Sequence, residues 1–92
     1  MTNVGPNDPT ISFLDPQTVP RDWEGTLKIH GSNFDNGSVV FFNGKTLGAK
    51  FKSASLLEVE VKKDITGTAG TKKVKVHTAA GGLSKEADFI VK

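Results

Sequence analysis

Apolar and polar residues alternate along most of the chain from residue 10 onward, interrupted by turn-forming residues roughly every eight to twelve positions. The alternation is clearest in Thr26–His30, where Leu27 and Ile29 share one side and the polar residues share the other. A period of two is typical of half-buried strands, whereas an amphipathic helix spaces its apolar residues by three and four. The pattern therefore predicts short antiparallel strands and no convincing helix.

About seven segments show this pattern. They are Thr10–Leu14, Thr26–His30, Ser38–Phe42, Leu47–Phe51, Leu56–Val61, Lys72–Thr78 and Ala87–Lys92. Pro16 ends the first because proline cannot donate to a sheet ladder, and Asn43-Gly44 favours a tight hairpin turn after the third. We predict an all-β, immunoglobulin-like sandwich of about seven short antiparallel strands over residues 10–92, preceded by a linker or flexible leader at residues 1–9.

Length and composition narrow the functional classes. The chain has 92 residues, which is enough for one modest core but not for two domains. It contains no cysteine, so thiolate catalysis and Cys-based zinc sites are excluded. Its net charge of +2 is too balanced to indicate nucleic acid as a partner. No segment resembles a signal peptide or a membrane span, so we expect no membrane insertion.

No grouping of residues in the sequence indicates an enzyme. The two histidines, His30 and His77, are expected on the outer faces of different sheets, where they cannot share a metal or form an acid–base pair. Glu58 and Glu60 are expected to point to solvent from one strand. We therefore predict no catalytic residues and no cofactor. The oxygen-rich loop at residues 33–36 is an alternative calcium site, but Asn and Asp are also ordinary turn residues, which is the favoured interpretation.

Six short motifs occur in the order seen in IPT/TIG domains, an immunoglobulin-like family shared by plexins, transcription factors and bacterial surface proteins. They are Pro9–Ile11 with Pro16, Leu27–Phe34, Val40–Gly44, Leu57–Val61, Val74–Val76, and Gly82–Ser84 followed by Phe89–Val91. The most specific is Gly31–Phe34, in which Gly31 is expected to need an unusual backbone angle and Phe34 to plug the core. Family members often place a proline after the fifth strand, where this chain has Lys62-Lys63. The resemblance implies a scaffold for contacts and no reaction.

Strict alternation predicts a contact face on the sheet that contains the third, sixth and seventh predicted strands. If the other apolar residues of these strands point inward, three large apolar side chains point outward, at Val39, Phe41 and Ile90. Their expected polar border consists of Lys73, Lys75, His77 and Asp88. An apolar centre with a polar rim is typical of a protein interface, although scattered apolar surface residues are also common.

Three functional hypotheses follow. The first is a non-catalytic interaction, spacer or assembly module of a surface, virion or multidomain protein, binding a protein partner or neighbouring domain, with an extracellular or surface location suggested by the resemblance. The second is a carbohydrate-contacting accessory domain, with Trp23 and Phe41 as the available platforms because most phenylalanines are expected in the core. The third, nucleic-acid binding, requires the lysines of residues 62–75 to converge.

Overall fold

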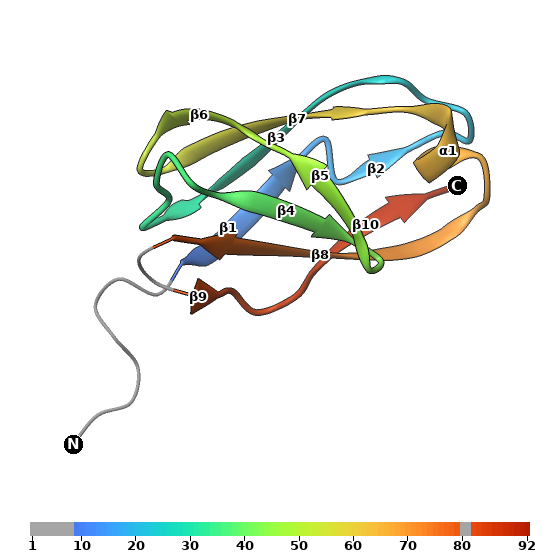
Figure 1. The fold of residues 1–92 in the computed structure, drawn as a ribbon. Helices are drawn as coiled ribbons and strands as arrows, with labels where there is room; N and C mark the ends of the chain where they lie inside the picture. Colours follow the sequence, from blue (N-terminus) through green and yellow to red (C-terminus); the bar gives the residue numbers. More distant parts are fainter. Residues whose placement is uncertain (1–8, 80–81) are drawn as a thin grey trace.

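Two β-sheets pack face to face in the computed structural model, which describes residues 9–79 and 82–92 (Figure 1). The four-stranded sheet contains, in spatial order, β1 (Thr10–Asp15), β3 (Gly25–Ser32), β7 (Leu56–Val61) and β6 (Lys50–Ser53). The six-stranded sheet contains β2 (Thr18–Val19), β10 (Ala87–Val91), β8 (Gly70–Thr78), β4 (Val39–Phe42) and β5 (Lys45–Gly48), with β9 (Gly82–Leu83) paired to β8. The predicted all-β, immunoglobulin-like sandwich is confirmed.

The core lies between the sheets and consists of the apolar residues that alternate inward. Fifteen apolar side chains are buried in the described part of the chain: Leu14, Val19, Leu27, Ile29, Phe34, Val40, Phe42, Leu57, Val59, Val61, Ile65, Val74, Val76, Phe89 and Val91. Phe34 is only 4% exposed, so the predicted core plug is confirmed. Full burial of such side chains stabilises the fold by roughly 1.5–3 kcal/mol each.

The prediction of a single fourth strand at Leu47–Phe51 is wrong. The structure divides it into β5, which pairs with β4, and β6, which pairs with β7 in the other sheet. Ala49 lies between the two strands, so the chain changes sheets at this residue. Leu47, Ala49 and Phe51 continue the period-two pattern across the crossing, so periodicity did not reveal the change.

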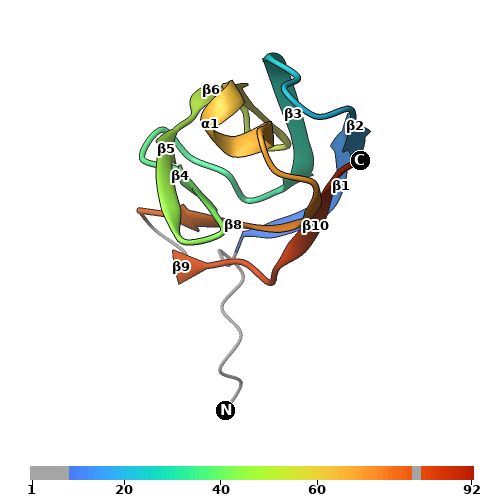
Figure 2. The ribbon, with the colours of Figure 1, turned by 90° about the vertical axis from the view of Figure 1, so that its right-hand side faces the viewer.

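A single helical turn, α1 (Lys63–Thr66), follows β7 where no helix was expected. It closes one end of the sandwich (Figure 2). Ile65 and Thr66 are buried, and the Thr66 hydroxyl donates to the carbonyl oxygen of Trp23 at 2.6 Å. Thus β7 ends at Val61, and α1 follows where family members often have proline. No helix in residues 9–79 or 82–92 is long and apolar enough to cross a membrane.

Glycine is needed at two positions, 44 and 31, for different reasons. Gly44 follows Asn43 in the two-residue hairpin between β4 and β5, and both have positive φ angles, 90° and 52°, as predicted for this turn. Gly31, in contrast, is absent from the described residues with positive φ, so the expected unusual backbone angle is wrong. A Cβ atom there would lie 1.9 Å from the carbonyl oxygen of Thr10, which shows that the close approach of β1 excludes other residues.

The first strand begins at one end of the sandwich, and the chain ends at the opposite end. β1 starts at the left of Figure 1, while the C-terminus lies at the right, beside α1. Within the described residues, β2 and β10 are the strands that pair in parallel. Two backbone hydrogen bonds join these strands and the residues beside them. The N–H of Ile90 donates to the carbonyl oxygen of Gln17 at 2.8 Å, and the N–H of Lys92 donates to the carbonyl oxygen of Val19 at 2.9 Å. Of the expected leader, residues 1–8 lie outside the described residues.

Candidate interaction face

The outer face of the six-stranded sheet is built by the residues of β4 and β8 that alternate away from the core. Phe41 pairs with Lys75, and Val39 pairs with His77, which pairs in turn with Leu83 on β9. Cross-strand partners share a side of the sheet, so these five side chains lie in two neighbouring rows. Val39 and Phe41 are half-buried, while Leu83 is 51% exposed. The pattern of the sequence did not predict Leu83 as a member of this face.

A hollow of about 400 Å³ lies on this face, and we call it the Phe41 hollow. Its lining consists of Phe41, Asn43, Gly44, Lys73, Lys75, Leu83 and Glu86. The hairpin supports one side, because Asn43 N–H donates to the Lys73 carbonyl at 2.7 Å and Lys73 N–H donates to Asn43 Oδ1 at 3.3 Å. The hollow combines apolar and charged residues in one concave site, which is a typical arrangement for recognition.

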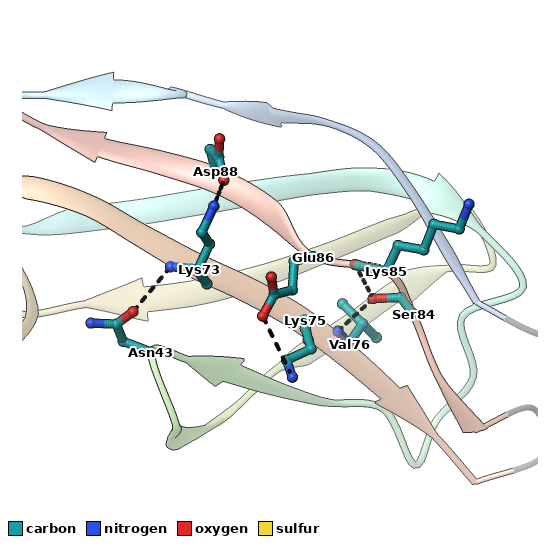
Figure 3. A network of polar contacts seen from close by, with 8 residues as sticks. All are labelled: Asn43, Lys73, Lys75, Val76, Ser84, Lys85, Glu86 and Asp88. Atoms are coloured by element: carbon teal, nitrogen blue, oxygen red, sulfur yellow. Dashed lines mark hydrogen bonds and ion pairs between the residues drawn. The ribbon is translucent and has the colours of Figure 1, made fainter.

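The lysines of the Phe41 hollow are paired with carboxylates (Figure 3). Lys73 Nζ lies 2.7 Å from Asp88 Oδ1, and Lys75 Nζ lies 3.7 Å from Glu86 Oε2. The hydrogen bond to Asp88 raises the pKa of Lys73 above its ordinary value. These ion pairs cancel much of the local positive charge, so the rim is polar but not strongly basic.

Ser84 fixes the segment that leads from Leu83 to Glu86. Its hydroxyl accepts a hydrogen bond from Val76 N–H at 2.9 Å and donates to the Lys85 carbonyl at 2.9 Å (Figure 3). Its own N–H donates to the Val76 carbonyl at 2.8 Å. Ser84 lies between β9 and β10 and is buried. Its hydroxyl is therefore the hydrogen-bond partner of a backbone N–H of β8. This contact holds Leu83 and Glu86 beside the hollow.

Ile90 lies on the same outer face but not in the same cluster. It pairs with Thr71 on β8, whereas Phe41 pairs with Lys75. Four residues of a strand correspond to roughly 13 Å, and the Lys73–Asp88 ion pair lies between them. The expected single patch of Val39, Phe41 and Ile90 is thus corrected to a cluster of Val39, Phe41 and Leu83, with Ile90 apart.

Trp23, the other candidate contact residue, lies in the loop before β3 and packs against the core. Its ring centroid is 6.4 Å from that of Phe89, and the ring lies over Gly25, where a Cβ atom would come within 2.7 Å of it. The side chain is half-buried, so much of the indole covers the α1 end of the sandwich. Only its remaining surface is available to a ligand.

Fewer of the phenylalanines are buried in the core than expected. Of the six in the chain, Phe34, Phe42 and Phe89 are buried, while Phe13 and Phe51 are 53% and 38% exposed. Strand alternation did not identify Phe13, because a β-bulge between Ile11 and Phe13 shifts the face that follows.

The residues considered for a calcium site and for a nucleic-acid site take part in other contacts within the fold. Asp35 Oδ1 accepts hydrogen bonds from the N–H groups of Gly37 and Ala79, at 2.9 and 3.2 Å, so this carboxylate organises its loop. His30 on β3 and His77 on β8 belong to different sheets. Lys62 lies 3.8 Å from Glu60, at the end of β7 in the four-stranded sheet, whereas Lys73 and Lys75 lie on β8 of the other sheet and are paired with carboxylates.

A family model and solved structures match this fold. The model described as "IPT/TIG domain" matches residues 9–90. A TIG domain from human nuclear factor of activated T-cells, cytoplasmic 4, matches with a TM-score of 0.70 and 17% identity, over 99% of this chain and 95% of that domain. No curated protein matches the sequence.

Two other similar structures are parts of much longer bacterial chains. A gamma-CGTase from alkalophilic Bacillus clarkii matches with a TM-score of 0.74 and 19% identity, over 99% of this chain and 13% of that one. An auxiliary nutrient binding protein from Bacteroides thetaiotaomicron matches with a TM-score of 0.64 and 18% identity, over 92% of this chain and 21% of that one. This chain thus spans a small fraction of both.

Proposed function

Since the chain belongs to the IPT/TIG domain family, we propose that it is a non-catalytic interaction and spacer module that contacts a protein partner or neighbouring domain through the Phe41 hollow. The observation that carries this proposal is the apolar cluster of Val39, Phe41 and Leu83 beside two ion pairs on an open sheet face. Such a face offers apolar area for affinity and paired charges for orientation.

The arrangement of the chain supports a role between other domains. Its fold begins at one pole and ends at the other, so flanking segments leave from opposite ends (Figure 1). The same fold makes up 13% and 21% of two longer chains among the similar structures. We place the module in an extracellular or surface protein, on the family resemblance.

A site-specific crosslinking experiment tests this proposal. A photoreactive residue at Leu83 should form one defined crosslink in the producing cell, and Phe41→Ser should abolish it. A photoreactive residue at Phe51, which is also exposed but lies on the other sheet, is the matched control. Equal crosslinking from both positions, or an unchanged crosslink in Phe41→Ser, would show that the Phe41 hollow is not the contact site.

A second candidate function is carbohydrate contact by an accessory domain. Two of the similar structures favour it, because one is named a gamma-CGTase and the other a nutrient binding protein. Affinity electrophoresis through gels that contain soluble polysaccharides tests this function directly. Retarded migration in a polysaccharide gel supports it, and unchanged migration in every gel contradicts it.

A further inference from the structure

Phe13 and His30 form a stacked pair on the outer face of the four-stranded sheet. The two residues are cross-strand partners on β1 and β3. Their ring centroids are 4.2 Å apart and their planes differ by only 7°. Phe13 is nevertheless 53% exposed, more than any other large hydrophobic residue in the described part of the chain. A flat aromatic ring is thus held in a fixed orientation at the surface.

One face of the Phe13 ring is open. The imidazole of His30 covers the face toward β3, while β1 is an edge strand of this sheet within the part of the chain that the structure describes. The imidazole itself makes no hydrogen bond within residues 9–79 and 82–92, so its nitrogens are available to a ligand. The pair therefore offers an apolar ring face beside a polar ring edge.

Charged residues beside the stacked pair balance one another. Asp15 follows Phe13 on the same side of β1, roughly 7 Å along the strand, and lies directly across from Lys28. Lys28 also pairs with Glu58, which pairs with Lys50, so this row has two positive and two negative residues. No ion pair among the described residues involves Asp15 or Lys28. The row provides hydrogen-bonding groups without a net field that would select a charged ligand.

We propose that the Phe13–His30 pair is a binding platform for one hexose ring of a neutral saccharide. The C–H groups on one face of a pyranose ring pack against the electron-rich face of an aromatic ring. The hydroxyl groups at the edge of the sugar then reach Asp15, Lys28 and the His30 nitrogens, which supply both donors and acceptors. This inference rests on the second proposed function and assigns it to a face opposite the Phe41 hollow.

Affinity electrophoresis with matched variants tests the platform. The wild-type chain is run through gels that contain a neutral α-linked glucan, a neutral β-linked glucan or an anionic polysaccharide. We expect retardation by a neutral glucan, and we expect Phe13→Ala to weaken that binding by about tenfold or more. Phe51→Ala is the control, because Phe51 is an exposed phenylalanine on the other edge strand of the same sheet. Phe13→Trp preserves the ring and should keep the binding.

The outcomes separate the platform from the function on which it rests. If no gel retards the wild-type chain, carbohydrate contact and the platform are both rejected. If Phe13→Ala binds a neutral glucan as the wild type does, carbohydrate contact holds and the platform is rejected, whether or not Phe41→Ala binds. Binding to the anionic polysaccharide alone also rejects it. Thermal unfolding of Phe13→Ala, expected to be close to wild type because the ring is exposed, confirms that lost binding is not lost folding.

Discussion

The inner and outer faces of β4 and β8 belong to the same two strands, but their side chains differ in how deeply they are buried. On the inner face, Val40, Phe42, Val74 and Val76 are all at most 1% exposed. On the outer face, half-buried Phe41 lies across from Lys75 at an open hollow, and the lysines of β8 that line it are paired with carboxylates. Stability therefore depends mainly on one side of these strands, which leaves the other side available for contacts.

The largest expected effect contrasts two phenylalanines that are adjacent in sequence. Phe42→Ala should lower the free energy of unfolding by about 3–5 kcal/mol, because it removes a buried ring and leaves a cavity. Phe41→Ala, on the outer face, should cost about 1 kcal/mol or less. Urea unfolding of both variants measures the difference. Similar losses would show that the outer ring also belongs to the core.

Ser84→Ala should have an intermediate effect, because a buried hydroxyl links the outer segment to β8. Removing it leaves Val76 N–H without its partner, so we expect a loss of about 1–3 kcal/mol in the free energy of unfolding. Ser12→Ala, at an exposed position of β1, is the control and should change stability by about 0.5 kcal/mol or less. A Ser84→Ala variant as stable as the control would contradict this role.

A smaller effect is expected from the two glycines of the β4–β5 region. Gly44→Ala should destabilise by about 1–2 kcal/mol, since its φ of 90° is unfavourable for alanine although no atom lies within 4 Å of the added Cβ. Gly48→Ala meets equally open space without a positive φ, so it should be neutral or stabilising by about 0.4–1 kcal/mol. Thermal unfolding of the pair separates backbone conformation from packing. Equal shifts would mean that the turn does not require glycine.

The smallest effects should come from exposed ion pairs. The hydrogen bond from Lys45 lowers the pKa of Asp64 below its ordinary value of 3.8, so this contribution is present above that pH and is lost as the pH falls further. Asp88 raises the pKa of Lys73 above 10.5, so that contribution is present below this pH and is lost at higher pH. Lys45→Gln should flatten the acid limb of Tm against pH, and Asp88→Asn the alkaline limb. Both changes should shrink in high salt because the groups are exposed. Limbs that remain unchanged in these variants would contradict the assignment.

The sequence predicted those parts of the fold in which a strand has one apolar and one polar side. Leu56–Val61 matches β7 residue for residue, because Glu58 and Glu60 alternate with three inward apolar residues. The crossing at Ala49 was not predicted, since which sheet a strand joins depends on distant pairing. The turn of α1 was missed because four residues are too few to show a helical period.

The candidate site was predictable only where strand alternation held. Val39 and Phe41 lie on the outer face as expected, because β4 is regular. Leu83 was missed because it belongs to a two-residue strand whose partner, β8, supplies the register. Phe13 was missed because the β-bulge in β1 shifts the side to which the following residues point. These positions depend on pairing between strands rather than on local composition.

The parallel contact between β2 and β10 determines how the module responds to mechanical load. Tension on a chain that enters at one pole and leaves at the other pulls these two strands in opposite directions along their length. The bonds from Ile90 to Gln17 and from Lys92 to Val19 are then sheared together and must break together, whereas an unzipped hairpin breaks its bonds one at a time. A contact of only two residues on each strand thus acts as a clamp, and it joins the second strand of the domain to its last strand.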